Sequence, residues 1–151
     1  MHDLVNHIVG EHLWAPLLLA GATVAEVGDR FDGDVLGNDP VKAWDRAQRE
    51  SNAAFHRPGA LDIDVHTSGG MTPGVEYAWQ MTSDLAVHAW DLARGIGADD
   101  TLDEELASSV YAYIEPEVDS WQGIGVFAPP VKIADSARTQ DRLVALLGRR
   151  P

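Results

Sequence analysis

A stripe of apolar residues at helical spacing most constrains how this chain can fold. From residue 101 to residue 122, apolar side chains recur on one helical face: Leu102, Leu106, Val110, Ile114, Val118 and Trp121. Such a face must pack against other elements, because most helices in proteins owe their stability to the burial of an apolar face. Thr101 can cap this helix, and Pro116 is expected to bend it because proline has no backbone N–H to donate.

Four further segments have helical patterns, and one segment has the pattern of a strand. The helical segments are residues 3–20, 41–55, 73–95 and 138–147. Asp39 and Pro40 precede the second of them as an N-cap and a first-turn proline. Residues 61–67, LDIDVHT, alternate apolar and polar side chains, which is typical of a half-buried strand. The sequence therefore predicts a mostly α fold with a short β-strand or hairpin element.

Length and charge restrict the class of protein. The 151 residues are enough for one domain with its own core, over residues 1–151. The net charge is −13, which argues against binding to nucleic acid or to an anionic membrane. The start, MHDLVNHIVGEH, lacks the basic and apolar regions of a secretory signal, and the longest apolar run, residues 14–20, is too short to span a bilayer. We expect a cytoplasmic protein with a small-molecule substrate.

The chain contains no cysteine, which limits its chemistry. A disulfide framework, a thiolate metal site and a protein thiol nucleophile are all excluded. A metal would have to be bound by His, Asp or Glu, and any thiol would have to come from a cofactor. A serine hydrolase is poorly supported, because the chain has no G-x-S-x-G motif.

The segment DLAVHAWDLARGIG, residues 84–97, places a polar stripe on an otherwise apolar helix. Asp84, His88 and Asp91 share one helical face. A carboxylate and an imidazole one turn apart can bind one divalent metal ion. They can also form a buried hydrogen-bonded pair without a metal. Asp91 could orient a metal ligand or could be an ordinary surface carboxylate.

His7 is the third candidate ligand, on the predicted helix over residues 3–20. A single histidine on an apolar face is more often a core residue than a ligand. With Asp84 and His88, however, it would give three N/O ligands from two helices, which leaves one coordination position open, as in catalytic sites. This donor set suits zinc first, and also nickel, iron or manganese. Asp3 could orient His7 or could simply lie in a first helical turn.

The remaining candidates have weaker signals. Trp14 could line a pocket or pack in the core. Arg94 and Arg142 could bind a substrate carboxylate or form surface ion pairs. Three histidines are expected on the surface or in loops, and a fourth is terminal: His12, His56, His66 and His2. No catalytic residue and no residue that contacts an organic cofactor can be assigned.

Several motifs occur in an order and spacing typical of a known family. They are DLVNHIVG, DVLGNDPVKAW, DLAVHAWDLARGIG, FAPPV and ADSARTQDRLVALLGRRP. In these motifs the chain resembles an actinobacterial branch of the DinB-like superfamily, which is similar to the metal-binding N-terminal domain of mycothiol-dependent maleylpyruvate isomerase. The resemblance covers nearly the whole chain. It implies a four-helix bundle with a divalent metal bound by His7, Asp84 and His88.

The chain differs from the family pattern at two places. The isomerase has glutamate where this chain has Asp84, which is shorter by one methylene. Family members usually have a further helix before the DLxxH motif, and this helix is expected to be missing here. The apolar faces that it would cover must be buried in another way or by a second copy of the chain, as in a homodimer.

Three functions are compatible with the resemblance. The first is a metal-dependent transferase or isomerase that uses a low-molecular-weight thiol such as mycothiol. The second is a metal-binding protein without catalytic activity. The third is a metal-assisted hydrolase that needs no thiol.

Overall fold

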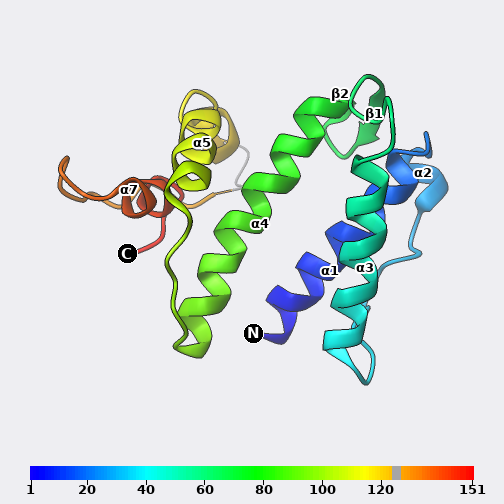
Figure 1. Ribbon diagram of the computed structural model, residues 1–151. Coiled ribbons are helices and arrows are strands. Elements are labelled where there is room, and N and C mark those ends of the chain that lie inside the picture. Colours follow the sequence, from blue (N-terminus) through cyan, green and yellow to red (C-terminus); the bar gives the residue numbers. More distant parts are fainter. Residues whose placement is uncertain (124–126) are drawn as a thin grey trace. The chain divides into compact units, whose positions relative to one another are not determined.

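The computed structural model describes residues 1–123 and 127–151 of the chain. The fold is mostly helical, and one two-stranded antiparallel sheet accompanies the helices (Figure 1). This confirms the predicted fold class. The chain divides into two compact units, Met1–Met81 and Thr82–Pro151, and the division falls within the long helix α4 (Gly74–Ile96). Within the described part of the chain, no helix is long and apolar enough to cross a membrane.

Three helices build most of the N-terminal unit: α1 (His2–Leu18), α2 (Val24–Val27) and α3 (Pro40–Phe55). The predicted cap of α3 is confirmed, because the Asp39 side chain accepts a hydrogen bond from the Lys42 N–H at 3.1 Å. The short α2 begins with a capping box, in which Thr23 and Glu26 satisfy each other's backbone N–H groups. Pro16 lies inside α1, which ends two residues later.

A short hairpin connects α3 to α4. Strand β1 (Asp64–Thr67) pairs with β2 (Gly70–Pro73), with Val65 opposite Thr72. Gly74 follows directly, and its N–H donates to the Ile63 carbonyl at 2.7 Å. A Cβ at this position would lie 2.7 Å from the Ala60 oxygen, so glycine permits the close approach at the start of α4.

The core of the N-terminal unit lies between its helices and the hairpin. Helices α1 and α3 pack against each other. One apolar cluster joins α1 to the hairpin and the start of α4, with Val65 and Tyr77 fully or nearly buried. A second cluster places Val9 against Leu36 and Ala47. These contacts fix the helix that carries His7.

Three helices follow α4 in the C-terminal unit: α5 (Glu104–Ile114), α6 (Val118–Gly123) and α7 (Thr139–Leu146). Asp103 caps α5 by accepting a hydrogen bond from the Leu106 N–H at 2.9 Å, where Thr101 had been expected to act. The predicted helix over residues 101–122 is interrupted between α5 and α6, around Pro116.

The apolar stripe that was predicted from the sequence forms the core of the C-terminal unit. Val110 and Ile114 of α5 are fully buried, as is Leu143 of α7. They pack with Ala86 and Val87 of α4. One side of α4 is thereby fixed in this core. Because the helix cannot rotate about its axis, the directions of its polar side chains Asp84, His88 and Asp91 are fixed as well.

Candidate metal centre

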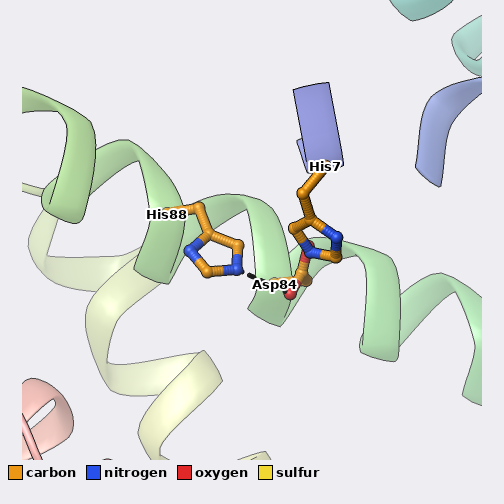
Figure 2. A group of neighbouring side chains, drawn as sticks. All are labelled: His7, Asp84 and His88. Carbon is orange, nitrogen blue, oxygen red and sulfur yellow. Dashed lines mark ion pairs between the residues drawn. The ribbon is translucent and has the colours of Figure 1, made fainter. Parts of the chain in front are cut away.

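Asp84 and His88 form the centre of the polar stripe on α4. They are one helical turn apart and therefore lie on the same face. The side chains are 34% and 18% exposed, so the pair lies at the edge of the core and not within it. Figure 2 shows both residues on α4, with their ion pair dashed, and draws His7 of α1 as well.

The distance within this pair fits a shared metal ion. His88 Nε2 lies 3.2 Å from Asp84 Oδ1. Two ligand atoms that are each about 2.1 Å from a tetrahedral zinc ion are separated by about 3.4 Å. Imidazole nitrogen and carboxylate oxygen are also ligands that zinc, nickel, iron and manganese accept. The pair therefore fits a divalent metal ion in both spacing and chemistry.

Asp91 binds the other nitrogen of the same imidazole. His88 Nδ1 and Asp91 Oδ2 are 2.9 Å apart. An ionised carboxylate can only accept, so the Nδ1–H donates and the Nε2 position is directed toward Asp84. A carboxylate on the far nitrogen is the usual partner of a metal-binding histidine. Of the two roles considered for Asp91, the contact with His88 favours the orienting one.

The carboxylates of Asp84 and Asp91 have a strong effect on the pKa of the His88 imidazole. Hydrogen bonds to Asp84 and then to Asp91 raise the pKa of His88 to about 9, although partial burial lowers it. Burial would raise the pKa of Asp91, but hydrogen bonds from His88 and Arg149 outweigh it and lower that pKa to about 2. In the metal-free protein at neutral pH, an imidazolium therefore lies between two carboxylates.

Arg149 completes this network from the other end of the C-terminal unit. Its Nη2 donates to Asp91 Oδ2 at 2.8 Å, and its Nε donates to Oδ1 at 2.9 Å. This fork-to-fork geometry is the strongest arrangement between arginine and a carboxylate. Arg149 could not be identified from the sequence, because 58 residues separate the two partners and no local spacing connects them.

His7 belongs to the N-terminal unit, where α1 presents a half-exposed imidazole. The side chain is 45% exposed, and its Nδ1 lies 3.9 Å from Glu11 Oε1, one turn further along. The preceding Asn6 fixes this part of α1. Its amide donates to the Gly33 carbonyl and accepts from the Val35 N–H, both at 2.8 Å.

One expectation about the histidines was wrong. His12 is only 6% exposed and packs edge-on against Trp44, with ring centroids 5.0 Å apart. The sequence contained the signal, because His12 lies four residues after the buried Ile8 and next to Leu13 on the apolar face. His56 is exposed at the end of α3, as expected, and its Nδ1 lies 2.9 Å from the Asn52 carbonyl oxygen.

The other candidates have structural partners. Arg94 forms an ion pair with Asp100 at 3.1 Å. Arg142 lies over the Tyr111 ring and donates to its hydroxyl at 3.0 Å.

Two candidates of the N-terminal unit have similar partners. Trp14 packs against the core of its unit and edge-on to Phe31. Asp3 lies 3.6 Å from His2.

Comparison with known proteins identifies the family of the chain. Residues 1–93 match the family model of the mycothiol maleylpyruvate isomerase N-terminal domain, and this range contains His7, Asp84 and His88. An uncharacterized protein of Mycobacterium tuberculosis, present in two strains, is 30% identical over 158 residues, which cover 99% of this chain and 79% of the relative. No solved structure shows significant similarity to the chain. The chain therefore belongs to the family of the mycothiol maleylpyruvate isomerase N-terminal domain.

Proposed function

We propose that this protein binds one divalent metal ion through His7, Asp84 and His88, each of which would offer one ligand atom. The observation that carries the proposal is the geometry of His88. One ring nitrogen lies 3.2 Å from Asp84, and the other is bound to Asp91 at 2.9 Å. A carboxylate on the ring nitrogen that faces away from the metal is typical of a metal-binding histidine, and Asp91 holds that position on His88. Zinc is the first choice of metal, and the two units would act together as one metal-binding domain.

The proposed activity is the transfer or isomerisation of an electrophilic substrate with a low-molecular-weight thiol, and mycothiol is the first candidate. Family membership supports the choice of thiol. The absence of cysteine supports it too, because a thiol nucleophile must then come from outside the chain. When bound, the metal would supply the positive charge that lowers the pKa of a thiol toward neutrality. Asp84 and His88 would hold that charge at the surface of α4.

Metal content is the first test of the proposal. Protein that is purified without chelators is expected to contain about one metal ion per chain by elemental analysis. His88→Ala should lose this metal, and His56→Ala, which removes an exposed histidine outside the site, should keep it. Because a ligand that binds only the native state stabilises it, the metal should also raise the Tm of the wild type but not that of His88→Ala. Equal metal content in the two variants would refute the site.

Turnover separates the proposed activity from its alternatives. The metal-loaded protein should consume maleylpyruvate, or another unsaturated acid, only when mycothiol is present. A metal-loaded protein that is inactive with every thiol would be a metal-binding protein without catalytic activity. Hydrolysis of an ester substrate at the same rate with and without thiol would point to the metal-assisted hydrolase.

A further inference from the structure

We propose that Arg149 is a positioning residue for the metal centre, which it reaches through Asp91 and the imidazole of His88. The inference rests on the proposed metal site but adds a residue that lies outside the part of the chain matched by the family model, residues 1–93. It makes the end of α7 a part of the site. No contact between Arg149 and the metal is involved.

Arg149 and Asp91 are in direct contact. Three hydrogen bonds connect them, at 2.8, 2.9 and 3.2 Å. Both side chains are 22% exposed, so the pair is only partly screened by water. A bidentate arginine fixes both the position and the plane of a carboxylate. Asp91 is therefore held in one orientation.

Asp91 is also in direct contact with His88. The oxygen that accepts from the Arg149 Nη2 also accepts from the His88 Nδ1, at 2.9 Å. A carboxylate that is fixed by arginine therefore fixes the plane of the imidazole. The opposite nitrogen of that ring, Nε2, is the one that lies 3.2 Å from Asp84. The orientation of the proposed ligand atom thus depends on Arg149.

The backbone at the end of α7 brings Arg149 to Asp91. Helix α7 ends in a Schellman motif, in which the Gly148 N–H donates to Ala145 O at 3.1 Å and the Arg149 N–H donates to Val144 O at 2.9 Å. Gly148 has a φ of +82°, which favours glycine, and a Cβ there would lie 2.5 Å from the Ala128 Cβ. The motif reverses the chain directly after the helix and places Arg149 beside α4.

The turn after α7 is held by backbone groups, so the role of the Arg149 side chain can be tested without breaking the turn. The hydrogen bond that ends α7 comes from the backbone N–H of Arg149, so Arg149→Ala retains it. The Arg149 Nη1 also donates to the Leu147 carbonyl at 3.1 Å, within the same turn. Arg149 follows the end of α7, and its side chain is partly exposed and not part of the apolar core. The variant is therefore expected to fold, and its metal-free Tm measures this directly.

The test is the zinc affinity of four proteins, measured by competition with a chromophoric chelator. Arg149→Ala should bind zinc roughly tenfold more weakly than the wild type, at the lower end of the range for partners of metal ligands. Arg149→Lys should be intermediate, because lysine retains the charge but cannot bind both carboxylate oxygens. Arg150→Ala is the matched control and should bind like the wild type, since it removes the same charge from an exposed neighbour. An unchanged affinity of Arg149→Ala would overturn the proposal.

A second measurement keeps this proposal distinct from the proposed function. In metal-free protein with ¹³C-labelled histidine, NMR relaxation of the His88 ring should show greater mobility in Arg149→Ala than in the wild type and in Arg150→Ala. If the wild type binds no zinc, the proposed function fails, and this readout still decides whether Arg149 positions the ring. Equal mobility in all three proteins would overturn the positioning role.

Discussion

Protons and metal ions are expected to compete for His88, and the raised pKa sets the size of the effect. A metal needs the neutral imidazole, but the pKa of His88 is about 9 in the metal-free protein. Each pH unit below this value reduces the neutral fraction tenfold, so about one His88 in a hundred is neutral at pH 7. The apparent zinc affinity should therefore rise about tenfold from pH 7 to pH 8.

Isothermal titration calorimetry measures this proton directly. At pH 7, in buffers of different ionisation enthalpy, zinc binding should release about one proton from His88. Asp91→Asn removes one of the carboxylates that raise the pKa, so its affinity curve should shift to lower pH. Asp119→Asn makes the same change at an exposed position of α6 and should leave the curve in place. An affinity that is constant from pH 6 to pH 8, without proton release, would refute the reasoning.

As the pH rises, the metal-free protein should become less stable because of the raised pKa of His88, whereas zinc binding should become stronger. Because the folded pKa of His88 lies above its ordinary value of 6.5, the charged imidazole stabilises the fold fully below about pH 6.5. This contribution is lost as the pH rises through about 9. Zinc affinity and the stability of the metal-free fold are therefore expected to change with pH in opposite directions.

Three further substitutions and one control substitution test the packing of the fold. Gly148→Ala should lower the free energy of unfolding by at least about 1–2 kcal/mol in urea denaturation, because of the positive φ and the contact with Ala128, and should weaken zinc binding as Arg149→Ala does. Gly74→Ala should lower the free energy of unfolding by about 1–3 kcal/mol, because its Cβ would meet two backbone oxygens at 2.7 and 2.8 Å. Gly69→Ala is the control and should leave the free energy of unfolding nearly unchanged, because the nearest contact of its Cβ is at 3.5 Å. Leu143→Ala should lower the free energy of unfolding by about 2–5 kcal/mol in the same assay, since the loss of this fully buried side chain would leave a cavity. A decrease below about 1 kcal/mol for Gly74→Ala or for Leu143→Ala would contradict the packing described.

Capping signals and apolar periodicity in the sequence were sufficient to predict most of the fold. The Asp39–Pro40 signal identified the N-cap and the first-turn proline of α3, which begins one residue before the expected range. The strict periodicity of residues 101–122 identified the core of the C-terminal unit. The interruption between α5 and α6 was harder, because Pro116 is compatible with either a bend or a break. Strand β2 has little apolar alternation, and its pairing with β1 is what identifies it.

Only the part of the candidate site that lies on one helix could be predicted from the sequence. Asp84, His88 and Asp91 lie on one face of one helix, so their proximity follows from periodicity alone. The role of Arg149 depends on how α7 packs in the C-terminal unit, and no local pattern contains that information. The buried His12 is a different case, because the buried Ile8 four residues earlier and the neighbouring Leu13 already indicated that it lies on the apolar face of α1.

The contact between Asp91 and Arg149 has a consequence for the order of synthesis. The two residues are 58 positions apart, so the ribosome completes α4 well before Arg149 exists. A nascent chain therefore carries His88 with its Asp91 partner still unanchored. The contact of His88 with an anchored Asp91 can therefore form only after α7 and the turn that follows it have been synthesised.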